Sequence, residues 1–402
     1  MSHSPFSTLP MAARDPILGL NEAFAADTRT GKVNLGVGVY YDDNGKLPLL
    51  ASVKQAETQR NAAAPAHGYL PIDGIASYNA CVQTLLFGTG SALISEQRVA
   101  TVQALGGTGA LKVGADLLRR FIPDAQVWIS DPSWENHKAL FEGAGFTVNT
   151  YPYYDADTQG VLAEDMIATI NGLPAKSIVV LHACCHNPTG VDLSAEHWSR
   201  VVKACVDRQL VPFLDIAYQG FGDGIEADAA AVRQFAQAGI DFLVSSSFSK
   251  SFSLYGERVG ALSVVAQDKD EAARILSQLK RVVRTNYSNP PTHGGAVVST
   301  ILSSPELRAL WEQELAGMRD RIRAMRTGLV ERLAQRGVKR NFDFVTRQRG
   351  MFSYSGLTSA QVDRLRDEFG IYAVSTGRIC LAALNSHNID AVADAMAKVM
   401  ED

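Results

Sequence analysis

Short apolar runs alternate with amphipathic stretches through the middle of the chain. Four apolar runs are typical of buried strands and cover residues 127–130, 177–181, 211–215 and 240–244. Between them, apolar residues recur at helical spacing, which predicts helices over residues 108–121, 134–144, 194–209 and 228–238. Strands and helices that alternate at this spacing indicate right-handed crossovers and a mostly parallel sheet, so the pattern predicts the α/β class.

The pattern changes in the last quarter of the chain. A long helix with one apolar face is predicted around residue 318, and short strands are expected over 352–355 and 378–382. The N-terminal segment carries its own predicted strand over 33–39 and is expected to pack beside this region. We therefore expect a large domain over residues 46–317 and a smaller, discontinuous α+β domain over 1–45 and 318–402.

Charged residues on this long helix are expected to face solvent. Four arginines lie close together on it, and a solvated polar face is the ordinary arrangement for such a group. These residues are Arg319, Arg321, Arg323 and Arg326.

Composition narrows the class of protein. The chain has 402 residues and a formal net charge of −4, which argues against a nucleic-acid surface. No apolar run approaches the ~20 residues that span a bilayer, and the first residues lack the pattern of a secretory signal. Five irregularly spaced cysteines favour reduced thiols in a cytoplasmic protein. The histidines and cysteines of the segment 182–186 cannot all converge on one ion from a strand, so no metal site is expected.

A lysine lies just beyond the last of the four apolar runs. Lys250 falls in the segment 245–260, SSSFSKSFSLYGERVG, at the end of a predicted strand, where active sites of open α/β sheets lie. The nearby serines and Arg258 could hold a phosphate while Lys250 forms a Schiff base with an aldehyde on the same cofactor. A strand-to-helix loop with an ordinary solvated lysine is the alternative, and this segment alone does not decide between them.

Two further segments carry groups suited to a ligand. The glycine-rich stretch 105–111 opens a predicted helix, where the amides of Gly107 and Thr108 can bind an anion. Asn187, in a His-Asn-Pro-Thr-Gly turn, follows the 177–181 strand and can donate a hydrogen bond to a ligand oxygen. For both segments, a turn that serves packing alone is the alternative interpretation.

A carboxylate ends a third apolar run. Asp215 is costly to bury unless it meets a cation, and Tyr218 follows it; capping of the next helix is the alternative. Together, the segments meet the needs of pyridoxal phosphate: an amine, an anion nest, a carboxylate for the ring nitrogen, donors for the phenolic oxygen and a flat side chain. The residues for these needs are, in that order, Lys250; Gly107, Thr108, Ser247, Ser249 and Arg258; Asp215; Asn187 and Tyr218; and Trp134.

These segments resemble the fold-type I aminotransferases, and specifically the aspartate/aromatic aminotransferase subfamily. The matching stretches span nearly the whole chain and are GGTGALKVGAD, DPSWENHK, HACCHNPTG, PFLDIAYQGFG, SSSFSKSFSLYGERVG, RTNYSNPP, RNFDF, QRGMFSY and STGRICLAALN. The resemblance implies a large domain with a mostly parallel seven-stranded sheet, a smaller α+β domain, and pyridoxal phosphate as the cofactor. It also implies a homodimer with shared active sites.

The resemblance adds residues that contact substrate or the neighbouring subunit. Arg378 is implied to bind the α-carboxylate of every substrate, and a bidentate arginine pair suits that task. Arg284 is implied to cross the dimer and bind the side-chain carboxylate of dicarboxylic substrates, and Tyr69 to reach the neighbour's phosphate. Gly38 and Ile17 lie in segments that cover the substrate. The implied substrate-binding residues are therefore Arg378, Arg284, Gly38, Trp134 and Asn187.

The implied reaction is ping-pong transamination between an amino acid and 2-oxoglutarate. Lys250 serves as the general base and acid, Asp215 keeps the ring nitrogen protonated, and Tyr218 completes the implied catalytic set. A nicotinamide-dependent dehydrogenase is a remote alternative in which the glycine loop binds a pyrophosphate. Against that alternative, no acidic residue is placed to bind a ribose about 20 residues after the loop in a proper βαβ unit.

Two substrate preferences compete within the subfamily. Asn289 and Thr108 resemble the aspartate type. Features of the bacterial aromatic type are Tyr41, Leu47 and the segments 253–258 and 378–380. We therefore expect an enzyme that accepts aromatic amino acids (tyrosine, phenylalanine) and dicarboxylic ones (aspartate, glutamate), with an aspartate-specific aminotransferase as the alternative.

Overall fold

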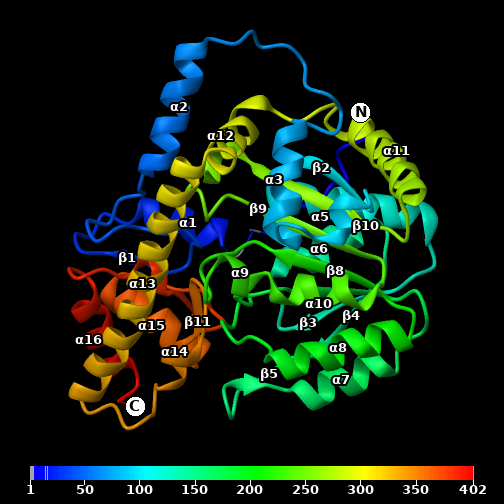
Figure 1. The fold of residues 1–402 in the computed structure, drawn as a ribbon. Helices are drawn as coiled ribbons and strands as arrows, with labels where there is room; N and C mark the ends of the chain where they lie inside the picture. Colours follow the sequence, from blue (N-terminus) through cyan, green and yellow to red (C-terminus); the bar gives the residue numbers. More distant parts are fainter. Residues whose placement is uncertain (1–3, 14, 16, 402) are drawn as a thin grey trace.

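A seven-stranded sheet forms the centre of the molecule (Figure 1). The structure, a computed structural model, describes residues 4–13, 15 and 17–401. The strands follow the order β2-β10-β9-β8-β7-β3-β4. Their bounds are β2 Val99–Leu105, β3 Val127–Asp131, β4 Val148–Pro152, β7 Ile178–His182, β8 Val211–Ile216, β9 Phe242–Ser247 and β10 Val259–Val265. β10 runs opposite to the other six strands of this sheet, so the predicted α/β class with a mostly parallel sheet is confirmed.

Helices cover both faces of this sheet, which explains why its strands are continuous apolar runs (Figure 1). In β8, Phe213 belongs to one buried core cluster and Leu214 to another, because successive side chains point to opposite faces. The helices of this region are α2 Ala51–Ala63, α3 Ala76–Phe87, α4 Ala92–Ser95, α5 Gly106–Phe121, α6 Glu135–Gly143, α7 Ala163–Asn171, α8 Ala195–Asp207, α9 Ile225–Asp228, α10 Ala230–Ala238, α11 Lys269–Asn286 and α12 Thr292–Ser303. A short hairpin joins β5 Tyr154–Asp155 to β6 Gly160–Val161.

The last quarter of the chain packs against the N-terminal segment, as predicted. Strand β1 (Val33–Asn34) pairs in parallel with β12 (Ile371–Tyr372), and β11 (Phe352–Tyr354) pairs antiparallel with β13 (Arg378–Cys380). The predicted strand over 33–39 is thus shorter than expected, because only its first two residues pair in register with β12. The helices here are α1 Leu18–Ala26, α13 Pro305–Gln335, α14 Phe344–Arg347, α15 Ser359–Phe369 and α16 Ile389–Val399.

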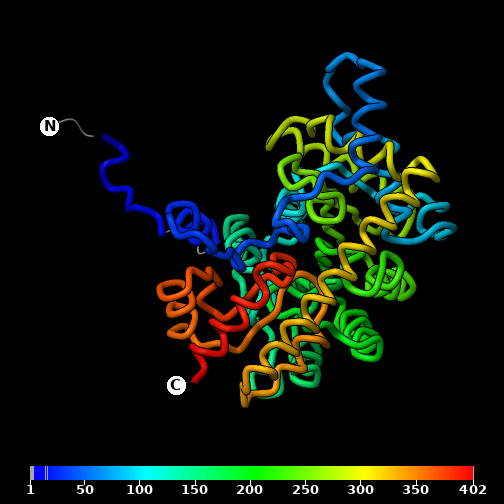
Figure 2. The backbone as a smooth tube through the Cα atoms, turned by 90° about the vertical axis from the view of Figure 1, so that its left-hand side faces the viewer, coloured from blue at the N-terminus to red at the C-terminus, as the bar shows by residue number. Residues whose placement is uncertain are grey.

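Helix α13 is continuous across the predicted domain boundary at residue 318, as the long tube in Figure 2 shows. The division into domains over 46–317 and over 1–45 with 318–402 stays a prediction. Among the described residues, no helix has both the length and the apolar character that crossing a bilayer requires.

The predicted solvated arginine face of α13 is wrong for Arg319, Arg321 and Arg326, which are partly or fully buried, whereas Arg323 is exposed. Each of the four arginines donates hydrogen bonds to backbone carbonyl oxygens of neighbouring segments, and Arg326 is only 2% exposed. A guanidinium carries five N–H donors, so it can bind several carbonyl oxygens at once. The bonds run from Arg319 to Gly220, from Arg321 to Tyr41 and Leu384, from Arg323 to Gly222, and from Arg326 to Val345, Gly350 and Phe352.

The close packing of α5 on the sheet can be tested by a substitution at Gly114. A Cβ atom at Gly114 would lie 2.5 Å from Cζ of Phe213. We expect Gly114→Ala to lower the free energy of unfolding by about 1–3 kcal/mol, because overpacking outweighs the higher helix propensity of alanine. The urea midpoint of the cofactor-loaded protein measures this change.

The matched control is Gly317→Ala on α13. Nothing lies within 4 Å of a Cβ at that exposed position, so alanine should stabilise the protein by up to about 1 kcal/mol. A Gly114→Ala protein at least as stable as the parent would contradict the packing described for α5.

Candidate active site

A pocket of about 380 Å³ lies at the carboxyl ends of β7, β8 and β9. This is the edge of an open α/β sheet at which ligands are expected to bind. Most of the residues predicted from the sequence line it together. They are Ile17, Gly38, Gly107, Thr108, Trp134, Asn187, Asp215, Tyr218, Ser247, Ser249, Lys250, Arg258 and Arg378.

Lys250 follows β9 and places its amine inside this pocket. Its Nζ lies 5.0 Å from the centre of the Tyr218 ring. Burial lowers the pKa of Lys250 to about 8; the negative charge of Asp215 opposes this shift and the positive charge of Arg258 adds to it. The amine is therefore partly neutral, and nucleophilic, near pH 8 rather than near the usual 10.5 of a lysine.

An anion cradle lies at the start of α5. Gly106 has a φ of +67°, and a Cβ there would lie 2.6 Å from Nη2 of Arg258, so glycine lets the guanidinium approach the helix N-terminus. Nη1 of Arg258 lies 3.4 Å from Oγ of Ser249, whose Oγ is 3.3 Å from that of Ser247. The helix amides, two hydroxyls and a guanidinium fit a phosphate group.

Asp215 is held by a histidine that the sequence had not indicated. Its Oδ2 lies 2.8 Å from Nε2 of buried His137, whose Nδ1 lies 2.9 Å from Oγ of Ser133. Burial opposes ionisation of Asp215, but the hydrogen bond with His137 and the charges of His137, His182 and Lys250 outweigh it and lower its pKa. This ionised carboxylate fits the protonated nitrogen of a pyridine ring.

A signal for His137 was present in the sequence. It lies three residues after Trp134 in the stretch DPSWENHK, on the first turn of α6, and the two rings pack edge to face at 5.2 Å. Other pocket residues that had no predicted role are Leu18, Val37, Leu111, His182, Cys184, Ala217, Tyr255 and Phe352.

Arg378 also lines the pocket. It is 2% exposed, and its guanidinium lies over the Phe352 ring, 4.3 Å from the ring centre. Nη1 donates to Oδ1 of Asn187 at 3.1 Å and Nη2 donates to the carbonyl oxygen of Gly36 at 2.7 Å. No ion pair with a carboxylate is formed among the residues that the structure describes, so this planar cation suits the carboxylate of a ligand.

Gly38 lies against the same aromatic ring. A Cβ at Gly38 would be 2.6 Å from Cζ of Phe352, so a larger residue would displace the ring. Ile17, just before α1, lines the pocket from the N-terminal segment.

Two predicted residues do not reach the pocket of their own chain. Tyr69 is 95% exposed and lies in the segment after α2. Arg284 is exposed on the last turn of α11, where it forms a hydrogen bond with Ser288. Both were predicted to act on a second subunit, and those roles stay predictions.

The chain belongs to the class I and II aminotransferases. The model of this family matches residues 30–396. The aspartate aminotransferase of Pseudomonas aeruginosa is 66% identical over 99% of this chain and all of its own length. The aromatic-amino-acid aminotransferase of Escherichia coli is 54% identical over 98% of this chain and all of its own length.

Solved structures show the same likeness. The aromatic-amino-acid aminotransferase of Burkholderia pseudomallei, which is covalently bound to pyridoxal phosphate, is 68% identical. It superposes with a TM-score of 0.97 over 99% of this chain and all of its own length. The fold and the family are thus established independently of the pocket.

The pKa of Lys250 leads to a test of this site. We expect cofactor-free protein to capture pyridoxal phosphate at a rate that rises with pH through about 8, because only the neutral amine attacks an aldehyde. Stopped-flow absorbance measures the rate at each pH. A rate that rises only near 10.5, as for an ordinary lysine, would contradict the burial described here.

The matched variant is Asp215→Asn. The charge of Asp215 raises the pKa of Lys250, so its removal should shift the midpoint of the profile below that of the parent protein. An upward shift would show that Asp215 does not act on Lys250 in this way.

Proposed function

We propose that this aminotransferase, with pyridoxal phosphate as its cofactor, transfers the α-amino group of aromatic and dicarboxylic amino acids to 2-oxoglutarate in the 380 Å³ pocket. The observation that carries the proposal is the convergence of Lys250, Asp215 and the Arg258 cradle on one cavity. An amine, a carboxylate and an anion nest in one pocket are the groups that this cofactor needs.

Asp215 and Lys250 have different roles in the proposed reaction. When bound, pyridoxal phosphate supplies a conjugated ring that accepts the electrons left as the substrate Cα–H bond breaks. Asp215, held ionised by His137, keeps a proton on the ring nitrogen. Lys250 Nζ takes the proton from the substrate Cα and delivers it again later in the reaction, since a base with a pKa near the working pH is effective in both directions.

Arg378 binds the α-carboxylate of the substrate. Its two Nη atoms are fixed by Asn187 and Gly36, so its plane is set before a ligand arrives. Trp134 and Phe352 give the pocket aromatic walls on the cofactor and substrate sides.

Apolar pocket walls and the exposure of a second cation, Arg284, support the aromatic preference. Ile17, Val37 and Phe352 offer surface to an aromatic side chain. Desolvating an arginine beside a phenyl ring is costly, so an enzyme for both substrate types must let Arg284 move away or become rehydrated. Arg284 is exposed and its side chain has one hydrogen-bond partner, Ser288, among the described residues.

An aspartate-specific aminotransferase is the second candidate. The 66% identical relative from Pseudomonas aeruginosa has the name aspartate aminotransferase, and Asn289 and Thr108 resemble that type.

We also propose a cytoplasmic homodimer in which Tyr69 and Arg284 complete the neighbour's site. The exposed aromatic ring of Tyr69 supports this arrangement, and so does the extended segment 4–13, which leaves the body of the molecule in Figure 2. Phe6 and Met11 on that segment are 71% and 96% exposed, and such apolar side chains favour a partner surface. The five free cysteines support a reducing compartment.

Relative rates with two amino acids test the substrate class. We expect kcat/KM for phenylalanine within about 100-fold of that for aspartate, because the apolar walls replace the ion pair that phenylalanine lacks. Lys250→Ala should lower both by at least about 10³-fold while the protein still binds the cofactor. A ratio beyond about 10⁴ in favour of aspartate would establish the aspartate-specific candidate instead, and turnover of Lys250→Ala near the parent rate would overturn the catalytic assignment.

Mixed dimers test the shared site. Lys250→Ala and Arg284→Asp subunits should each be inactive toward aspartate, yet together regain up to about a quarter of the parent activity. Random mixing makes half of the dimers mixed. In each mixed dimer, the subunit that keeps Lys250 receives an intact Arg284 from its partner, so one of the two sites is complete.

The control mixture combines Lys250→Ala with Arg378→Lys. Both residues line the pocket of one chain, so no mixed dimer has an intact site and no activity should return. Equal behaviour of the two mixtures would contradict the proposed exchange of Arg284.

A further inference from the structure

A fully buried arginine lies behind the substrate pocket without a carboxylate partner. Arg326 on α13 is 2% exposed, and no ion pair engages it among the described residues. Burial lowers its pKa to about 10, so it remains charged at neutral pH. A buried charge is costly, and only hydrogen bonds offset that cost here.

All its bonds go to one short segment, the link from α14 into β11. Its Nη1 donates to the carbonyl oxygen of Val345 at 3.0 Å. Its Nη2 donates to those of Gly350 and Phe352, each at 2.7 Å. Three bonds from one rigid, planar cation fix the path of this segment, because leaving the buried charge unsatisfied is expensive.

The fixed segment carries the ring that contacts the substrate residues. Phe352 lies under the guanidinium of Arg378 at 4.3 Å and meets the Tyr218 ring edge to face at 6.0 Å. It also fills the space beside Gly38. A shift of the Phe352 backbone would therefore change the surroundings of three pocket residues together.

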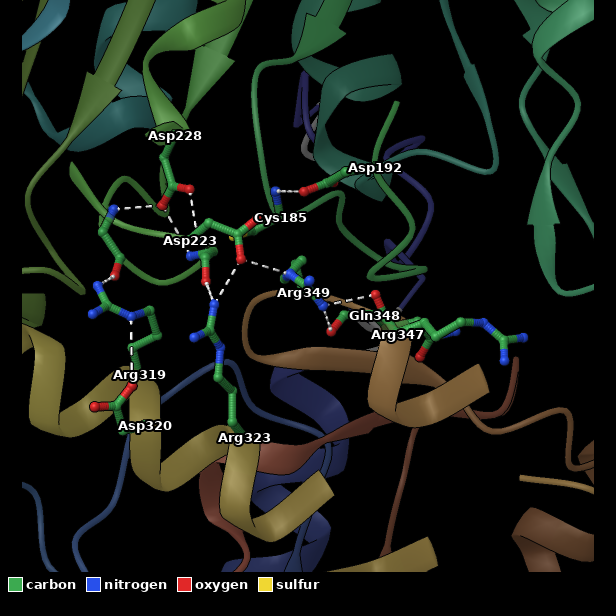
Figure 3. A network of polar contacts seen from close by, with 12 residues as sticks. Cys185, Asp192, Asp223, Asp228, Arg319, Asp320, Arg323, Arg347, Gln348 and Arg349 are labelled. Atoms are coloured by element: carbon green, nitrogen blue, oxygen red, sulfur yellow. Dashed lines mark hydrogen bonds and ion pairs between the residues drawn. The ribbon is translucent and has the colours of Figure 1, made fainter. Parts of the chain in front are cut away.

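A second arginine of α13, Arg323, takes part in exposed ion pairs instead of buried hydrogen bonds. Figure 3 shows Arg323 and Arg349 meeting at Asp223, at 2.7 and 3.0 Å. These three side chains are 35% to 55% exposed, so solvent screens their attraction. Arg323 therefore provides a matched comparison on the same helix.

We propose that Arg326 is a positioning residue for the substrate carboxylate, because its bonds to Gly350 and Phe352 set the Phe352 ring against Arg378. The inference rests on the proposed function of Arg378 and deepens it. Arg326 itself touches neither substrate nor cofactor; it acts through the backbone of β11.

Binding of 3-indolepropionate to the cofactor-loaded enzyme tests this inference. This compound has a carboxylate and no α-amino group, and it is the ligand of an aromatic amino acid aminotransferase structure 37% identical to this chain. We expect the dissociation constant to rise about tenfold in Arg326→Met and about threefold in Arg326→Lys, which keeps the charge but loses the planar fork. Arg323→Met should change it less than about twofold, and cofactor content should stay unchanged in all three.

A double-mutant cycle separates positioning from a general loss of structure. If Arg326 acts through the ring, Arg326→Met combined with Phe352→Leu should bind 3-indolepropionate about as weakly as Phe352→Leu alone. Independent effects that multiply, or an unchanged dissociation constant in cofactor-loaded Arg326→Met, would overturn the inference. If the Met variant yields no folded holoenzyme, Arg326→Lys decides by the same cycle.

Arg378→Lys distinguishes failure of this inference from failure of the proposed function. Weakened binding in Arg378→Lys with unaffected Arg326 variants would leave the role of Arg378 intact and remove that of Arg326. Unchanged binding in Arg378→Lys would overturn the carboxylate role itself, and with it the proposal for Arg326.

Discussion

The pairing of Asp215 with His137 governs the electrostatics of the pocket. A carboxylate at the end of a buried strand is tolerated only because His137 bonds to it and Lys250 is near. The same carboxylate opposes the loss of charge on Lys250, so burial lowers the pKa of the amine only to about 8. The buried charge of Asp215 thus suits a cationic ring nitrogen. It also keeps the pKa of the neighbouring Lys250 amine near the pH at which we expect the enzyme to work.

The sequence predicted those parts of the site that follow strand ends. Asp215, Asn187 and Lys250 lie just where apolar runs stop, and parallel strands bring these positions to one edge of the sheet. The strand pattern was correct for the same reason, since helices on both faces require continuous apolar runs. Three strands of the sheet were not assigned: Val99–Leu105 and Val259–Val265, which pair with each other, and Val148–Pro152, which pairs with β3.

Long-range contacts could not be predicted in the same way. His137 and Asp215 are 78 residues apart in the sequence, so the local pattern around His137 does not reveal their hydrogen bond. The arginines of α13 fit a solvated face by sequence pattern, and only the loops packed around the helix show that they bind carbonyls. The roles proposed for Tyr69 and Arg284 involve a neighbouring subunit, and residue patterns within one chain do not reveal contacts between subunits.

The alternation of β8 between two cores has a consequence for catalysis. Phe213 and Leu214 fill separate clusters on opposite faces of the sheet, and both are completely buried. A shift of β8 by one residue would exchange these side chains and turn Asp215 away from the pocket. Mispacking of either core would thus remove from the pocket the carboxylate that we propose for the cofactor's ring nitrogen, and with it the proposed activity. Packing of the two cores therefore fixes the register of β8 and, through it, the position of the Asp215 carboxylate.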